Sequence, residues 1–162
     1  VEPYRPDSYD LNVAVRTWPQ LQLSAIEKPL RSGSGSDILG YADKYVGGEG
    51  MVSAPRELPA DIDGATADRI REMATAIVDL AGVRGIARID FLADGGEIYV
   101  NEINTIPGSL AKYLWIEPAV PFETLLGDML DEAERRPTTH WTVQGADGTA
   151  LRSAGSIASK LS

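Results

Sequence analysis

The sequence contains no cysteine among its 162 residues. This absence excludes disulfide bridges and cysteine-built zinc sites, and it suits a reducing compartment such as the cytoplasm. No run approaches the ~20 continuous apolar residues that a membrane-spanning helix requires, and the first residues lack the pattern of a signal peptide. We therefore expect a cytoplasmic protein with no membrane partner.

Basic residues are scarce relative to acidic ones. Fifteen Lys and Arg against 24 Asp and Glu give a formal net charge of −9, and no Lys/Arg cluster is visible. Such a surface repels a phosphate backbone, so we expect no nucleic-acid partner. A nucleotide remains compatible with this charge, because divalent cations can lie between acidic side chains and phosphates.

Histidine is almost absent as well. His140 is the only one, and it has no metal-ligand partner at a useful spacing. Ser32, Ser34 and Ser36 lack a nearby histidine and aspartate, so the chemistry of serine hydrolases is not supported.

The sequence does contain enough apolar residues, 43%, to bury one core, and its length favours one domain. Apolar runs over residues 11–15 and 21–26, separated by a polar break with Pro19, predict two strands joined by a turn. A possible third strand covers residues 51–54, after a glycine cluster at 47–50. The glycine-rich segment 31–40 predicts a mobile loop that could order over a ligand.

Two segments show helical periodicity. Residues 65–81 give the strongest helix prediction, with Asp61 or Asp63 as its cap. Residues 123–134 form a second amphipathic pattern that follows Pro121. The pattern after residue 135 is irregular, and residues 149–161 predict a last helix that packs on the body of the domain.

A β-hairpin is predicted where two β-rich runs, 85–92 and 97–103, flank Ala93-Asp94-Gly95-Gly96. Side chains two apart on a strand share a face, so Arg88 pairs with Asp90 and Glu102 with Asn104. An odd-numbered loop places Arg88 across from Glu102, with Asp90 diagonal to it and all four on one face. A strict two-residue loop places the two pairs on opposite faces.

The hairpin side chains suggest a magnesium site. Asp90, Glu102 and Asn104 supply the oxygen ligands that Mg²⁺ prefers in proteins. Arg88 would stabilise the charge that develops on a transferring phosphoryl group. The alternative is an ion-pair row on a solvated sheet face. Spacing leaves both interpretations open.

The identity of the residues goes further. The string from Gly85 to Ser109, GIARIDFLADGGEIYVNEINTIPGS, closely resembles the signature of the D-alanine:D-alanine ligase family within the ATP-grasp fold. In that family an arginine–x–aspartate strand leads through a hairpin into asparagine–glutamate–x–asparagine–threonine and then proline–glycine. The resemblance implies the following roles: magnesium ligation by Asp90, Glu102 and Asn104, contact with the acyl phosphate and tetrahedral intermediate by Arg88, and a backbone amide at the reaction centre from Gly108.

Segments before the hairpin resemble nucleotide-binding parts of the same family. Residues 41–45, YADKY, resemble a tyrosine–glutamate–alanine–lysine–tyrosine segment. This implies that Lys44 contacts nucleotide phosphates and that Tyr45 closes the active-site loop. Glu2, Pro3 and Tyr4 resemble the hinge that binds adenine.

Asp10 takes the place of a family glutamate that binds the ribose hydroxyls. The sequence departs from the family pattern here, because it has an aspartate and one additional residue between the two positions. The alternative is that Asp10 only ends a strand.

A second departure concerns the substrate. The family carries a longer segment between the Pro-Gly pair and the serine–leucine pair that grips the acceptor carboxylate, whereas Ser109 and Leu110 follow Gly108 at once. We expect both residues to meet the acceptor in a reshaped pocket, which Lys112 and Tyr113 could line. Trp115 is expected in the core.

The resemblance covers residues 1–134 and implies an α+β fold, the carboxy-terminal ATP-grasp subdomain, with a mainly antiparallel sheet flanked by helices. Residues 135–162 are expected to pack on it, which makes 1–162 one subdomain. The implied activity is an ATP-dependent carboxylate–amine ligase that forms an amide such as D-alanyl-D-alanine through an acyl phosphate, as in peptidoglycan precursor synthesis. Its cofactors would be ATP and two Mg²⁺ ions, with Mn²⁺ as an alternative.

The expected partners are ATP, small amino-acid or peptide substrates and the missing amino-terminal part of the same enzyme, with a homodimer left open. Without that part we expect an inactive or nearly inactive fragment. Three alternatives remain open: a ligase for a different amino acid or peptide acceptor, a regulatory module that binds nucleotide and magnesium without turnover, and a metal-free scaffold.

Overall fold

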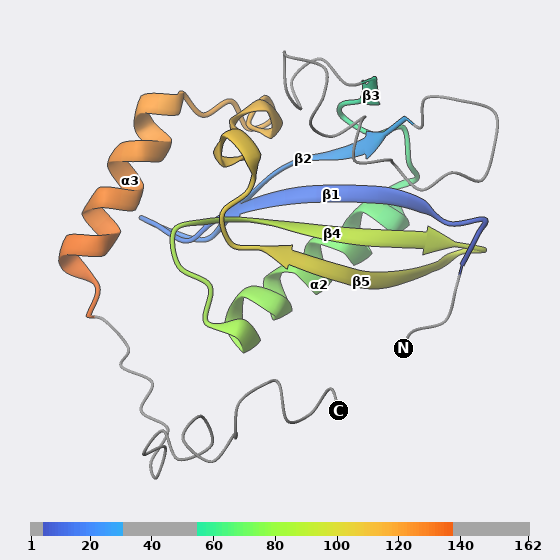
Figure 1. The fold of residues 1–162 in the computed structure, drawn as a ribbon, viewed down its shortest axis with the longest axis horizontal. Coiled ribbons are helices and arrows are strands. Elements are labelled where there is room, and N and C mark those ends of the chain that lie inside the picture. The colour runs from blue at the N-terminus through green and yellow to red at the C-terminus, as the bar shows by residue number, and fades with distance from the viewer. Residues whose placement is uncertain (1–4, 31–54, 138–162) are drawn as a thin grey trace, which may run out of the picture.

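The computed structural model describes residues 5–30 and 55–137, and these form one five-stranded antiparallel sheet with helices on both faces (Figure 1). The strands follow the order β3-β2-β1-β4-β5. Their bounds are β1 Tyr9–Arg16, β2 Gln22–Pro29, β3 Arg56–Glu57, β4 Ile86–Asp94 and β5 Glu97–Asn104. The predicted strand over 51–54, the glycine-rich segments 31–40 and 47–50, and the predicted helix over 149–161 lie outside the described residues.

The first two strands confirm the sequence prediction: β1 runs beyond residues 11–15 at both ends, whereas β2 starts one residue later than predicted and runs three residues further. Asn12 pairs with Glu27, and the register shifts by one residue between Val13 and Val15. At this shift the hydroxyl of Ser24 accepts the backbone N–H of Ala14 at 2.9 Å, which satisfies an amide that the ladder leaves out.

One face of the sheet packs against helix α2 (Gly64–Ala81), as the helical periodicity predicted. Of the two candidate caps, Asp63 is the one that accepts the backbone N–H of Thr66, at 2.9 Å. Gly82 ends the helix with φ +60°. The buried core under α2 comprises Leu11, Val13, Val15, Ile26, Ala87, Ile89 and Phe91 of the sheet with Ile70, Ala74 and Val78 of the helix.

Within residues 5–30 and 55–137, the opposite face is covered only at one end, where β1 ends and β4 begins. Helix α3 (Phe122–Arg135), which follows Pro121 as predicted, and the 3₁₀ helix η2 (Gly108–Leu114) pack there. Their apolar cluster comprises Ala14, Ile86, Ala111, Leu114, Trp115 and Leu125. The prediction that Trp115 is a core residue is confirmed. Neither α2 nor α3, the described α-helices, has the length and apolar character to cross a membrane.

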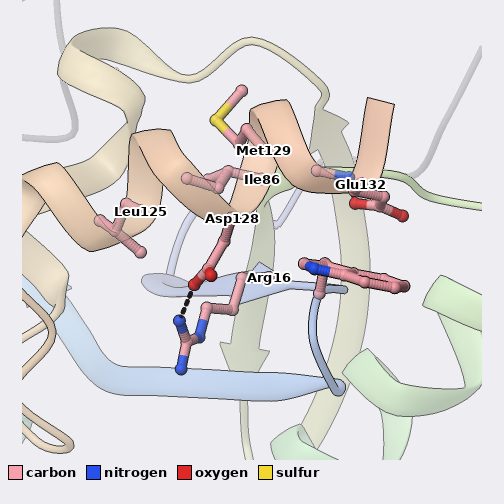
Figure 2. A pocket seen from close by; sticks show the side chains of 8 residues that line it. Arg16, Ile86, Leu125, Asp128, Met129 and Glu132 are labelled. Carbon is pink, nitrogen blue, oxygen red and sulfur yellow. Dashed lines mark hydrogen bonds and ion pairs between the residues drawn. The ribbon is translucent and has the colours of Figure 1, made fainter. Parts of the chain in front are cut away.

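A buried carboxylate fixes α3 to the sheet. Glu132 is 2% exposed. It accepts the Thr17 hydroxyl and the Gly85 backbone N–H, both at 2.7 Å, and the Arg136 guanidinium at 2.6 Å. Figure 2 shows Glu132 one turn along α3 from Asp128, which pairs with Arg16 of β1. These two contacts hold the helix at a fixed position over the end of the sheet.

Replacing Glu132 with alanine should lower the free energy of unfolding by about 3 kcal/mol, because it leaves buried donors without their acceptor. Burial raises the pKa of Glu132, but the bonds from Thr17, Arg136 and Gly85 outweigh it and lower the pKa below its usual 4.5. The stabilisation is therefore present at neutral pH and is lost as the pH falls through that lowered pKa.

Urea denaturation of wild type and Glu132→Ala at neutral pH and at about pH 3 measures both effects. The exposed Glu134 on the same helix supplies the control, since Glu134→Ala should change stability by less than about 0.5 kcal/mol. A difference between wild type and Glu132→Ala that grows on acidification would contradict the assignment.

Candidate functional site

Of the two hairpin loops that the sequence left open, the structure has the two-residue loop. Asp94 pairs with Glu97, so only Gly95 and Gly96 form the turn. Both have positive φ, +59° and +88°. Positive φ at both central positions is typical of the type I′ turn, which glycine adopts without strain.

A β-bulge restores the shared face that the turn alone would abolish. Phe91 pairs with Val100, but Asp90 pairs with Glu102, so Asn101 is an extra residue in β5. Side chains directly opposite each other in an antiparallel pair lie on the same face. The pairing of Arg88 with Glu102, which an odd-numbered loop would give, does not occur: Arg88 lies across from Asn104, and Asp90 across from Glu102.

The four side chains Arg88, Asp90, Glu102 and Asn104, here called the hairpin quartet, lie on one face and contact one another. Arg88 donates through Nε and one Nη to the two oxygens of Asp90, each at 2.7 Å. Asn104 donates its amide nitrogen to Asp90 at 2.9 Å and to Glu102 at 3.2 Å. The predicted convergence of the four is confirmed.

The charges in the quartet do not balance. Burial raises the pKa of Asp90 and Glu102 adds to the rise, while the bonds and charge of Arg88 oppose it, and the net shift is upward. Burial lowers the pKa of Arg88, but the hydrogen bonds and charge of Asp90 outweigh it and raise that pKa. The two carboxylates thus have more negative charge than one guanidinium offsets.

The donor set fits a hard divalent cation. Asp90 is 7% exposed whereas Glu102 is exposed, so one carboxylate is fixed and the other faces solvent. Asn104 bridges them with its amide nitrogen, and turning that amide over would present its oxygen instead. Among the described residues no group of three or more His, Cys, Asp or Glu forms a metal site, so any site here depends on the asparagine oxygen.

A second polar group adjoins the quartet across β1, β2 and β3. Asn12, Glu27, Arg56 and Tyr113, here called the Glu27 cluster, meet around a carboxylate that is 4% exposed. Glu27 accepts Arg56 at 2.9 Å, Asn12 at 3.1 Å and the Tyr113 hydroxyl at 3.2 Å. Sequence reasoning missed all of these except Tyr113. The only signal was a glutamate that ends an apolar run.

The segment after the hairpin has an uncommon backbone. Ser109, Leu110 and Ala111 all have positive φ, between 50° and 52°. A left-handed conformation costs roughly 1–2 kcal/mol for each non-glycine residue, so the surrounding packing must hold this turn. Ala111 is fully buried in the apolar cluster and anchors it. Gly108 and Ser109 are exposed, Leu110 is half-buried, and together they lie next to the end of β5.

Only one of the predicted nucleotide-binding residues, Asp10, lies within the described residues. Asp10 lies on β1 two residues before Asn12, which pairs with Asp90, so Asp10 shares the face of the quartet. Glu2, Pro3, Tyr4, Lys44 and Tyr45 lie outside the described residues, as do His140 and Ser32, Ser34 and Ser36. Lys112 is exposed, with its ammonium 5.2 Å from the Phe122 ring.

A five-stranded antiparallel sheet with helices on both faces matches the carboxy-terminal subdomain of ATP-grasp ligases. The D-alanyl-alanine synthetase A of Vibrio cholerae shares this fold, with a TM-score of 0.64 at 21% identity, over 79% of this chain and 39% of that one. The VanG D-Ala:D-Ser ligase of Enterococcus faecalis is 26% identical, with a TM-score of 0.60, over 78% of this chain and 36% of that one.

The family model described as the D-ala D-ala ligase C-terminus matches residues 1–131, and the chain belongs to this family. A D-alanine–D-alanine ligase from Thermosipho africanus is 34% identical over 128 residues, which cover 78% of this chain and 34% of the relative. One from Mycolicibacterium smegmatis is 37% identical over 103 residues, 60% of this chain and 26% of the relative. The chain spans about a third of the length of the curated relatives it matches.

Replacing Glu102 with glutamine should lower the pKa of Asp90, because Glu102 raises it through both its charge and its hydrogen bond. The carboxyl ¹³C signal of Asp90, followed through an acid titration by NMR, measures this shift. Glu97→Gln, at the turn end of β5, is the control and should leave the Asp90 titration unchanged. An Asp90 pKa that stays the same or rises in Glu102→Gln would show that the two carboxylates do not interact.

Proposed function

We propose that this chain is the carboxy-terminal catalytic part of an ATP-dependent carboxylate–amine ligase. The observation that carries the proposal is the convergence of the hairpin quartet on one face of an ATP-grasp sheet. Membership of the D-ala D-ala ligase C-terminal family supports it, and so do curated relatives named as D-alanine–D-alanine ligases.

The proposed reaction has two steps. A carboxylate oxygen of the first substrate attacks the γ-phosphorus of ATP, which gives an acyl phosphate and ADP. The amine of the second substrate then attacks the acyl carbon, an amide bond forms, and inorganic phosphate leaves with the oxygen that had linked it to carbon. No protein nucleophile is required, because the mixed anhydride already activates the carbonyl.

Asp90, Glu102 and Asn104 would hold two Mg²⁺ ions, with Mn²⁺ as an alternative ion. Such ions withdraw charge from the β- and γ-phosphates. Arg88 lies beside the ligands, with its guanidinium held by Asp90, and would stabilise charge on the transferring phosphoryl group and on the tetrahedral centre. The backbone N–H of Gly108 would contribute at the same centre.

The nucleotide would extend from the quartet toward the start of the chain. Asp10 shares the quartet's face and would bind the ribose. The remaining proposed nucleotide contacts rest on the family resemblance: Glu2, Pro3 and Tyr4 for adenine, Lys44 for the phosphates and Tyr45 for loop closure.

Ser109 and Leu110 would bind the acceptor. Their left-handed turn and the 3₁₀ helix that follows start directly after Gly108, which leaves a short acceptor segment. The Enterococcus faecalis relative is named a D-Ala:D-Ser ligase, so acceptors other than D-alanine occur on this fold. We therefore propose D-alanine or another small amino acid or peptide as the acceptor.

The proposal predicts that Arg88→Lys and Glu102→Gln each lower kcat about 10²–10³-fold in the full-length protein, because each removes a group that acts on developing charge. Phosphate release, screened against D-amino acids, L-amino acids and small peptides with Mg²⁺ and ATP, is the measurement. Glu97→Gln, which keeps the hairpin and lies away from the quartet, should retain wild-type activity.

Two results would contradict the ligase. Calorimetry that shows Mg²⁺-dependent ATP binding without phosphate release on any acceptor would indicate a regulatory module. No binding of Mg²⁺ and a non-hydrolysable ATP analogue would indicate a metal-free scaffold.

The 162-residue chain alone should release phosphate at less than about 1% of the rate reached with the amino-terminal part that longer relatives carry. The reason is that positioning two substrates against ATP supplies a large part of the rate of such a reaction. Mixing the chain with that part, made as a separate fragment, should restore turnover. Full activity of the chain by itself would show that the described sheet suffices for catalysis.

A further inference from the structure

Tyr113 joins the hairpin quartet to the Glu27 cluster. Its hydroxyl lies 3.2 Å from a carboxylate oxygen of Glu27 and 3.5 Å from an Nη of Arg88. The ring is held through its face, because the guanidinium of Arg56 lies over it, 4.5 Å from the ring centroid. One side chain from η2 therefore contacts residues of β2, β3 and β4.

The directions of these hydrogen bonds follow from what each group can donate. Glu27 already accepts from Arg56 and Asn12, and as a carboxylate it has no proton to give. Burial and the charge of Glu27 raise the pKa of Tyr113 to about 12, so its hydroxyl keeps its proton. That proton goes to Glu27, which leaves the oxygen lone pairs of Tyr113 directed at Arg88.

Arg88 contacts Tyr113 through a different nitrogen from those that it donates to Asp90. Arg88 uses Nε and one Nη for the oxygens of Asp90, and the other Nη faces Tyr113. If Asp90 shares its oxygens with a divalent cation, its hold on Arg88 weakens. The hydrogen bond that Arg88 donates to the Tyr113 oxygen does not depend on the cation.

The position of Tyr113 in the chain links Arg88 to the left-handed turn of Ser109–Ala111. Tyr113 follows the left-handed turn of Ser109–Ala111 within the same short helix. Ala111 and Leu114 on either side of it are fully buried, which fixes the helix on the sheet. The turn proposed to bind the acceptor and the arginine proposed to stabilise the reaction centre are thus tied together through one phenol.

We propose that Tyr113 and Glu27 are positioning residues, which hold the guanidinium of Arg88 in register with the acceptor turn. This inference rests on the proposed ligase function. Glu27 orients the Tyr113 hydroxyl, and the hydroxyl fixes the end of the guanidinium that Asp90 does not hold. Neither residue needs to touch ATP.

The kinetic test uses Tyr113→Phe, which keeps the ring over Arg56 and removes only the hydroxyl, and Glu27→Gln, which removes the carboxylate. Each should lower kcat about 10-fold or more while the KM for ATP changes less than about twofold, since a small misplacement of a catalytic group slows the chemical step. The double variant should be no slower than the slower single variant, because both act through Arg88. Tyr99→Phe on β5 is the matched control and should keep wild-type kcat.

A second measurement does not depend on activity. The side-chain Nε–H and Nη–H signals of Arg88, assigned by their loss in Arg88→Lys, report guanidinium rotation and hydrogen exchange by NMR. In Tyr113→Phe the Nη groups should rotate and exchange faster than in wild type, while Nε, held by Asp90, stays protected. Tyr99→Phe should give the wild-type signals.

The two measurements separate the failure of this inference from the failure of the ligase proposal. Unchanged Arg88 signals in Tyr113→Phe, or a raised KM for ATP with kcat intact, would overturn the positioning role even in an active ligase. If the full-length wild type releases no phosphate but the Nη groups of Arg88 still rotate faster in Tyr113→Phe, the contact between Tyr113 and Arg88 is supported and the ligase proposal is rejected.

Discussion

The pairing of β4 with β5 decides which face of the sheet each hairpin side chain occupies. A one-residue slip in an antiparallel pair moves every side chain to the other face. With a two-residue turn and a regular ladder, Glu102 would lie opposite Ile89 and point into the core under α2. The extra residue Asn101 prevents this, and places Glu102 opposite Asp90 instead. The quartet, its charge imbalance and its fit to a cation all depend on that bulge.

The two faces of the sheet show why this register is stable. The face under α2 carries the larger apolar core, to which Ile89 and Phe91 belong. The other face has its apolar cluster under η2 and α3, and beyond that cluster it carries polar groups, of which Glu27 and Asp90 are buried. Glu27 and Asp90 remain there because each has several donors within hydrogen-bond distance. The polar side chains on this face are therefore held in fixed orientations by hydrogen bonds, next to an apolar core.

Much of the fold could be predicted, because it depends on local periodicity. Apolar runs separated by a polar break predicted β1 and β2, helical spacing predicted α2 and α3, and the two glycines between β-rich runs predicted the hairpin. The bulge at Asn101 could not be predicted, since it depends on which residues of β4 and β5 pair across the ladder and not on the pattern of either strand alone. Glu27 was missed for a similar reason: its partners Asn12, Arg56 and Tyr113 lie 15, 29 and 86 residues away in sequence. The quartet was found because its members share one short hairpin and a family signature.

The account claims that Asp90, Glu102 and Asn104 bind divalent cations beside a nucleotide's terminal phosphates. A crystal structure of the full-length protein with Mg²⁺ and a non-hydrolysable ATP analogue tests this most directly. We expect metal–oxygen distances of about 2.1 Å to both carboxylates and to the asparagine amide oxygen, with Arg88 beside the γ-phosphate. A nucleotide bound with its metal ligated elsewhere, and the quartet still bonded as described here, would contradict the account.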